Sequence, residues 1–224
     1  LLSTSLIDSS FAAMYDDKTK LEELTKYAED GHANSQYKLG HAYSVGIGVI
    51  PKDDELSVKW YTKSAEQGHS ASQFALGEIY SLGQLTPKDS KKAFKWYLKA
   101  AEQGHSSAQY NIGNMYNQGD GTLKNNTQAF KWWKMSAEQG DASAQNNLGW
   151  AYGNGKGVVK NLSKSRFWVD KAYNNPSATN RVIELAKKNW DKLELWKYKD
   201  TAVSKKNKAE VGTSKLERFG TGFR

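Results

Sequence analysis

The sequence predicts an all-α fold, a right-handed α-solenoid (superhelix) of helix-turn-helix repeats. Tryptophan recurs every 36 residues, and two separate series of glycines repeat with the same interval apart from one step of 37. Self-similarity at a fixed period of this size is typical of repeat arrays, in which neighbouring units stack and bury a continuous core. The recurring residues are Trp60, Trp96, Trp132 and Trp168, then Gly40, Gly77, Gly113 and Gly149, and finally Gly46, Gly83, Gly119 and Gly155.

The first helix of each repeat is expected in a segment with the pattern Q-x-x-[LI]-G-x-x-Y-x-x-G. The four segments are residues 34–46, 71–83, 107–119 and 143–155. The apolar residue and the tyrosine lie four apart, which places both on one helix face. The glycine inside the helix costs about 1 kcal/mol relative to alanine. Its recurrence predicts a compensating close approach, with a large ring of a neighbouring helix on the bare backbone.

The second helix is expected in residues 57–69, 93–105 and 129–141. Each of these segments contains a tryptophan followed, five residues later, by the sequence AEQG. Tryptophan lies five residues before an alanine that is small enough to receive a ring from an adjacent helix. A lone second helix is expected at residues 21–32. Residues 163–174 depart from the pattern, as terminal units of repeat arrays do.

The combined pattern resembles the Sel-one-like repeat, an αα-hairpin unit related to the tetratricopeptide repeat. The residues that carry the resemblance are [LI]-G-x-x-Y-x-x-G-x-G-V followed by A-x-x-W-Y-x-K-A-A-E-Q-G, over residues 20–175. Departures occur at Gln84-Leu85 in the second loop and at Ser165, and they weaken single units only. The resemblance implies an adaptor that binds other proteins, in bacteria for host interaction or toxin neutralisation.

The domain organisation predicted from these patterns has four parts. Residues 1–17 are a leader or signal-peptide remnant, 18–175 the repeat array, 176–199 a C-terminal capping helix and 200–224 a basic flexible tail. The capping helix follows from the helical spacing of apolar residues after residue 180. Residues 1–180 carry 20 Lys and Arg against 18 Asp and Glu, whereas residues 181–224 carry 12 against 6. The net charge of +8 therefore lies mainly at the C-terminal end.

The N-terminal segment leaves two interpretations open. The stretch LLSTSLI, followed by Ser10-Phe11-Ala12-Ala13, fits the end of a secretory signal. A flexible leader or one short helix fits as well, because the charged start of a signal is missing and serines interrupt the apolar run. The first interpretation predicts a periplasmic or secreted protein, and the second allows a cytoplasmic one. No apolar stretch reaches about 18 residues, so no transmembrane segment is expected.

The sequence predicts no catalytic site, no metal site and no cofactor. Catalytic residues are normally unique in a chain, whereas the candidate acids and histidines recur with the period. Equivalent helices stack about 8–10 Å apart, too far for one metal to collect the histidines with bonds of about 2.0–2.1 Å. We interpret these histidines as solvated turn residues. The recurring groups are Glu66, Glu102 and Glu138, and His32, His69 and His105.

Two further kinds of site are excluded by composition and motif. The chain has no cysteine, which rules out disulfides and thiolate zinc sites. The G-x-G loops lack the preceding strand and the full spacing of a dinucleotide-binding motif, so they do not predict a dinucleotide site.

A partner-binding surface is predicted on the first helices, which line the concave groove of helical-hairpin solenoids. Two positions, four residues apart, vary from one repeat to the next while their neighbours stay constant. We interpret the variation as freedom from packing between repeats, with ordinary exposed drift as the alternative. The candidates are Tyr37, His41, Phe74, Glu78, Tyr110, Asn114, Asn146 and Trp150. Trp150 is the first choice because aromatic residues often anchor interfaces.

The predicted function is a non-enzymatic, monomeric scaffold that binds a protein or peptide in the concave groove. The resemblance adds a more specific hypothesis, a bacterial immunity protein neutralising a secreted toxin effector, or an envelope regulator. One alternative is a cell-envelope hydrolase, because some members of the family have cell-wall-related activities. The other is a binder of anionic surfaces or nucleic acid through the basic C-terminus. Nucleic acid is not the expected partner, because most of the aromatic residues recur at core positions.

Overall fold

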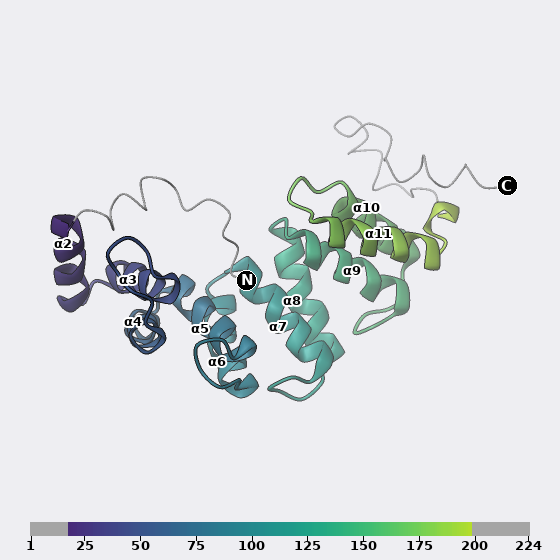
Figure 1. Ribbon diagram of the computed structural model, residues 1–224. Helices are drawn as coiled ribbons and strands as arrows, with labels where there is room; N and C mark the ends of the chain where they lie inside the picture. The colour runs from purple at the N-terminus through teal and green to yellow at the C-terminus, as the bar shows by residue number, and fades with distance from the viewer. Residues whose placement is uncertain (1–17, 199–224) are drawn as a thin grey trace. The chain divides into compact units, whose positions relative to one another are not determined.

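The computed structural model describes residues 18–198, and every regular element in that range is a helix (Figure 1). The predicted all-α repeat fold is confirmed. The leader (1–17) and the tail (200–224) lie outside the described residues. The helices are α2 (Lys18–Glu29), α3 (Ala33–Val45), α4 (Asp54–Glu66), α5 (Ser70–Leu82), α6 (Ser90–Glu102), α7 (Ser106–Gln118), α8 (Asn126–Glu138), α9 (Ala142–Asn154), α10 (Leu162–Tyr173), α11 (Asn180–Lys192) and the short 3-10 helix η1 (Leu195–Lys197).

The chain divides into two compact units, Leu1–His105 and Ser106–Arg224. In the first unit α3 pairs with α4 and α5 with α6, while α2 packs on α3 and α4 on α5. In the second unit α7 pairs with α8 and α9 with α10, while α8 packs on α9. Each helical hairpin is one repeat. Within residues 18–198 no helix is both long and apolar enough to cross a membrane.

Caps set the ends of the helices in each repeat. The second helices begin after a carboxylate or amide side chain whose oxygen accepts the backbone N–H three residues on. These N-caps are Asp53, Asp89, Asn125 and Asn161. Such a cap satisfies one of the unpaired N–H groups of the first turn. Helix α5, the first helix of the second hairpin, ends at Gly83, whose φ of 68° lies in the left-handed region that favours glycine.

Three of the four glycines inside the first helices accept a large ring, as predicted, whereas the fourth, Gly149, meets Val169. A Cβ added to Gly77 would lie 2.4 Å from Cδ1 of Tyr97, and one added to Gly113 would lie 2.4 Å from Cδ1 of Trp133. These rings come from the second helix of the same repeat. They are not the periodic tryptophans, because each ring belongs to the residue that follows one of them.

Three of the periodic tryptophans pack between repeats instead. Trp60 lies in one cluster with Ala28. Trp96 packs against the cluster that contains Ala65, and Trp168 against the cluster that contains Ala137. The alanine of one second helix therefore makes room for the tryptophan of the next, as the sequence predicted.

Buried glutamines form a second periodic contact that the sequence did not reveal. Gln73 is 3% exposed; its Nε2 donates to the carbonyl of Ala65 (3.0 Å), and its Oε1 accepts from Nε2 of Gln103 (2.6 Å). Gln36 repeats both contacts with Ala28 and Gln67. The side-chain amide of Gln73 thus joins the preceding repeat to the second helix of the repeat that contains Gln73. Both its nitrogen and its oxygen have a hydrogen-bond partner, as buried polar groups normally do.

Helix α11 lies on α10 and α9 and falls within the range expected for the capping helix. Trp190 of α11 is 3% exposed and shares a cluster with Val169, Ala186 and Leu195. The guanidinium of Arg166 lies 5.4 Å from the Trp190 ring centre, and its Nη1 donates to the carbonyl of Tyr198.

Candidate partner-binding surface on the first helices

In the first unit, the variable positions of α3 and α5 carry aromatic rings that contact the following helices. The Tyr37 ring centre lies 5.8 Å from that of Tyr61 and 5.0 Å from that of His69. Phe74 repeats this arrangement and stacks on His105 at 4.5 Å with an interplanar angle of 15°. The aromatic residue of the first helix therefore covers the turn histidine that follows the second helix of the same repeat.

This stacking corrects the interpretation of the turn histidines. His69 and His105 are partly buried, and only His32 is exposed. His69 also serves as the N-cap of α5, because its Nδ1 accepts the backbone N–H of Ser72. The solvated interpretation is therefore wrong for His69 and His105. Their rings pack against side chains 31 or 32 positions earlier in the sequence, which the repeat pattern does not indicate.

Partial burial changes the titration of three groups on this face. Burial raises the pKa of the Glu78 carboxyl and lowers the pKa of the His41 imidazole. Burial also raises the pKa of the Tyr37 hydroxyl, and the negative charge of Glu78 raises it further. Each shift favours the uncharged form, so the face disfavours charge at these positions.

We expect the stability of the protein to fall as the pH drops below about 6.5, partly because of His105. Burial lowers the pKa of His105 in the folded state, so the unfolded chain takes up a proton at higher pH. Protonation then favours unfolding, while protonation of Glu78 opposes it. The His105→Asn variant should lose less stability between about pH 7.5 and about pH 5, as measured by urea unfolding. An equal loss in variant and wild type would contradict this assignment.

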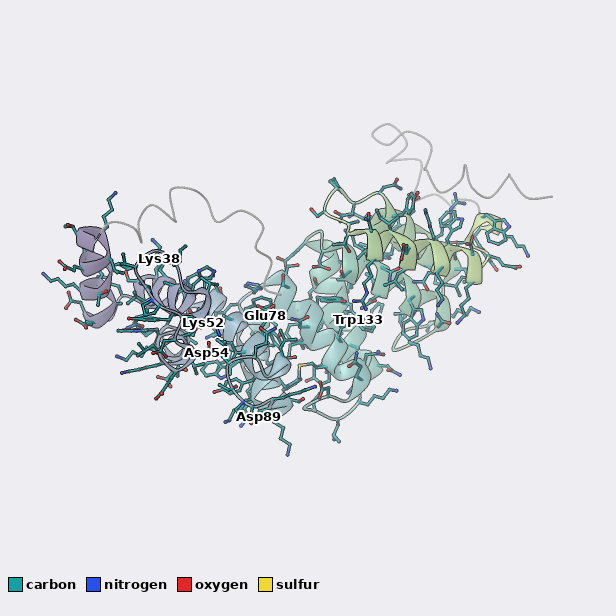
Figure 2. The ribbon with its side chains drawn as sticks, in the orientation of Figure 1. Lys38, Lys52, Asp54, Glu78, Asp89 and Trp133 are labelled. Carbon is teal, nitrogen blue, oxygen red and sulfur yellow. The ribbon has the colours of Figure 1, made fainter. Side chains whose placement is uncertain are left out.

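In the second unit, the variable positions of α7 and α9 carry amides and aromatic rings. Tyr110 packs against two neighbouring clusters of buried side chains. Oδ1 of Asn114 accepts from Nε1 of Trp133 at 3.0 Å. Trp133 is labelled in Figure 2 and belongs to α8. The Trp150 ring meets that of Trp133 edge-on, with centres 6.5 Å apart and an interplanar angle of 83°.

Asn146 differs from the other seven candidates because it is buried. It is 4% exposed, and its Oδ1 accepts from Nδ2 of Asn189 on α11 at 2.9 Å. The other seven are partly exposed. Variation between repeats therefore does not indicate freedom from packing, since Phe74, Asn114 and Asn146 all make specific contacts.

Sequence reasoning missed three side chains that belong to this surface or cover it: Trp133, Asn147 and Asn189. Trp133 stands at a position occupied elsewhere by Tyr61, Tyr97 and Val169. This break in the period is a signal in the sequence that could have identified Trp133.

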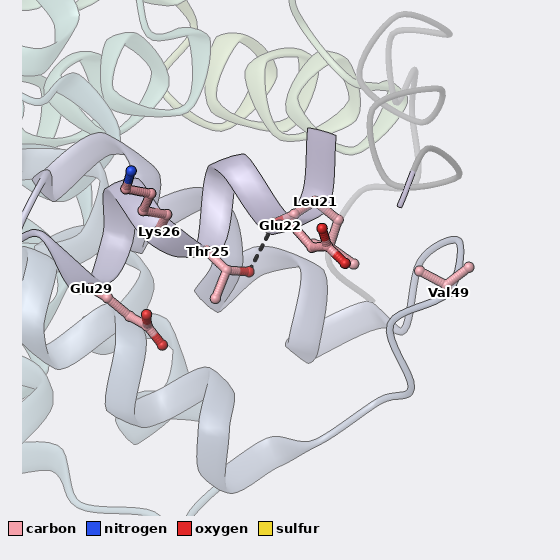
Figure 3. Close-up of a pocket in the computed structure, with 6 residues that line it drawn as sticks. All are labelled: Leu21, Glu22, Thr25, Lys26, Glu29 and Val49. Atoms are coloured by element: carbon pink, nitrogen blue, oxygen red, sulfur yellow. Dashed lines mark hydrogen bonds between the residues drawn. The ribbon is translucent and has the colours of Figure 1, made fainter. Parts of the chain in front are cut away.

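One pocket in the described part of the chain lies away from the predicted surface. It has a volume of about 470 Å³ and is formed by α2 and the loop that follows α3 (Figure 3). Leu21 and Val49 supply its apolar walls, and the Thr25 hydroxyl donates to the carbonyl of Leu21 at 2.8 Å. Across residues 18–198, no cluster of three or more His, Asp or Glu side chains could hold a metal ion.

Comparison with protein families assigns the fold. The Sel1 repeat pattern matches residues 33–69, 70–105, 106–141 and 142–177, which correspond to the four helical hairpins. This chain belongs to the Sel1 repeat family. The matches cover more than half of the chain and agree with the period of the tryptophans. Sel1 repeat proteins typically act as non-catalytic scaffolds for protein–protein interaction.

Solved structures of Sel1 repeat proteins resemble this chain. A protective antigen of uropathogenic Escherichia coli is 32% identical with a TM-score of 0.65, covering 78% of this chain and 40% of its own. A Sel1 repeat protein of Oxalobacter formigenes is 29% identical with a TM-score of 0.68, covering 77% of this chain and 50% of its own. The chain thus spans half or less of these relatives. Comparison with curated proteins finds no match.

Proposed function

We propose that this Sel1 repeat chain is a non-enzymatic scaffold that binds a protein or peptide on the surface of its first helices. The observation that carries the proposal is that the first helices of each unit carry partly exposed aromatic and amide side chains at positions that vary between repeats. Aromatic residues with few rotatable bonds bury much area at low entropic cost, which suits them to interfaces. The surface comprises Tyr37, His41, Phe74 and Glu78 in the first unit, and Tyr110, Asn114 and Trp150 in the second.

Asn146, the remaining candidate, is buried, and its oxygen is engaged by Asn189. We assign it a positioning role for Trp150, which lies four residues further along α9.

A more specific form of the proposal is a bacterial immunity protein or an envelope regulator, periplasmic or secreted. Family resemblance alone supports it. The glutamates of the AEQG blocks, Glu66, Glu102 and Glu138, are exposed and recur with the period, so they offer no support for the hydrolase alternative. The basic segment 200–224 lies outside the described residues, so binding through it stays a prediction.

Co-purification tests the proposal. Tagged wild type, Trp150→Ala and Trp196→Ala chains would be used to recover partners from the producing cells, with identification by mass spectrometry. We expect recovery of the specific partner to fall roughly tenfold or more with Trp150→Ala, as for an interface anchor. Trp196 on η1 is 42% exposed and outside the surface, so it is a matched control that should recover the partner normally.

Two results would count against the proposal. Equal recovery by the Trp150→Ala chain, with its fold verified by circular dichroism, would exclude Trp150 as an anchor. Turnover of a cell-wall substrate that stays with the protein through purification would favour the hydrolase instead.

A further inference from the structure

Three side chains at positions that vary between repeats meet in the second unit. Trp133 occupies a position held elsewhere by tyrosine or valine, and Asn114 a position held by His41, Glu78 and Trp150. Asn147 is the third member, at a position held elsewhere by Lys38, Ala75 and Asn111. Nε1 of Trp133 and Nδ2 of Asn147 both donate to Oδ1 of Asn114, each at 3.0 Å. Residues that recur are explained by the packing of the array, so this group needs another explanation.

The chemistry of the indole fixes the orientation of both amides. An indole nitrogen can only donate a hydrogen bond, so the atom of Asn114 that faces Trp133 must be its oxygen. Trp133 is 2% exposed and buried indoles normally need such a partner. Since the oxygen of Asn114 accepts from Asn147 as well, the atom that Asn147 presents to it must be its amino group.

This orientation leaves one donor and one acceptor available on two adjoining amide groups. Within the described part of the chain, no hydrogen-bond partner engages Nδ2 of Asn114 or Oδ1 of Asn147. Both residues are partly exposed, so the two groups can reach a ligand. Trp150, also partly exposed, follows Asn147 by three residues on α9 and so lies on the same side of that helix.

The two helices that carry the amides contain no residue that is charged at neutral pH, whereas α8, which carries Trp133, has the exposed residues Lys131, Lys134 and Glu138. Neither α7 (SSAQYNIGNMYNQ) nor α9 (ASAQNNLGWAYGN) contains Asp, Glu, Lys, Arg or His. In the first unit, by contrast, α3 carries Lys38 and His41, and α5 carries Glu78. Helices α7 and α9 themselves offer no partner for a charge, which suits their side chains to a neutral polar ligand.

We propose that the amides of Asn114 and Asn147 bind the main chain of an extended, uncharged peptide segment of the partner. In an extended chain the N–H and C=O of one residue point to the same side. Nδ2 of Asn114 donates to that C=O, and Oδ1 of Asn147 accepts from that N–H. An apolar side chain of the next residues rests on Trp150. This inference rests on the proposed function and defines its partner as a peptide read chiefly through its backbone.

A backbone-specific double-mutant cycle tests this assignment on the full chain. A peptide would be selected from a phage-displayed library of random dodecapeptides, and its amide nitrogens would be methylated one at a time. We expect one N-methyl position to weaken binding to wild type about threefold to tenfold, the loss of one hydrogen bond. The same N-methyl group should have little effect on the Asn147→Ala chain, because the acceptor is already gone.

A nearly isosteric variant tests the donor. Asn114→Asp keeps an oxygen for Trp133 and Asn147 but replaces the amino group by a second acceptor, so peptide binding should fall about tenfold or more. Asn34→Asp adds the same charge at an exposed position of α3 and should leave binding unchanged. Unfolding midpoints of all the variants would show whether lost binding reflects lost folding.

The outcomes separate this inference from the proposed function. Tight peptide binding with no coupling between any N-methyl group and Asn147 would overturn the backbone assignment and leave the scaffold proposal intact. Failure to select any peptide would overturn the inference, while co-purification would still test the scaffold. The protein could also be applied to an array of neutral oligosaccharides. Binding that is lost on replacing Asn114 would overturn the peptide inference, because it would assign the amides to a glycan.

Discussion

Replacing Trp190 by alanine should lower the free energy of unfolding of the second unit by about 3–5 kcal/mol. Trp190 is 3% exposed and packs with Val169 and Leu195, which are both fully buried. The substitution removes this ring and leaves a cavity that the surrounding helices α10, α11 and η1 can fill only in part. Urea unfolding followed by circular dichroism would measure the change.

Trp196→Ala provides the matched control, because its side chain is 42% exposed only six residues away. We expect its effect to stay within about 0.5 kcal/mol. Equal effects of the two substitutions would mean that α11 and η1 do not cover the last repeat as the structure has them.

Replacing Gly77 by alanine should destabilise the first unit by about 1–3 kcal/mol, although alanine is the better helix former. A Cβ at this position would lie 2.4 Å from Cδ1 and 2.6 Å from Cε1 of Tyr97. Tyr97 is 4% exposed and has little room to move. The steric cost is therefore expected to exceed the gain in helix propensity of about 1 kcal/mol.

A double-mutant cycle identifies the clash as the cause. Adding Tyr97→Ala should remove the cost of the alanine, so that Gly77→Ala becomes neutral or stabilising in that background. Additive effects of the two substitutions would show that the glycine is needed for another reason, such as its backbone conformation.

The close contacts at the glycines show how much of the helix packing the sequence predicts. A glycine repeated inside four helices carries a recurring cost, so its compensating contact could be predicted. The ring that makes the contact could not, because Trp96 and Tyr97 are adjacent and both aromatic. The structure separates them: Tyr97 lies on the glycine of its own repeat, while Trp96 packs on the preceding one.

For the predicted surface, the sequence identified positions but not the contacts made there. Position in the repeat identified helices and faces, and seven of the eight candidates are partly exposed. It did not identify contacts, and so Asn146 was placed on the surface although α11 covers it. The helix that buries Asn146 lies after the last repeat, where the period no longer indicates which residues are neighbours.

The sequence by itself determined the family, the four repeats and the positions that pack, because the same packing demand recurs in every unit and marks its residues with one period. Only the tertiary structure decided which polar atoms meet. Hydrogen bonds act over about 3 Å and depend on direction. The bonds that join Asn114 to Trp133 and Asn147 span 19 and 33 residues of sequence, and only the stacking of α7, α8 and α9 brings those atoms together.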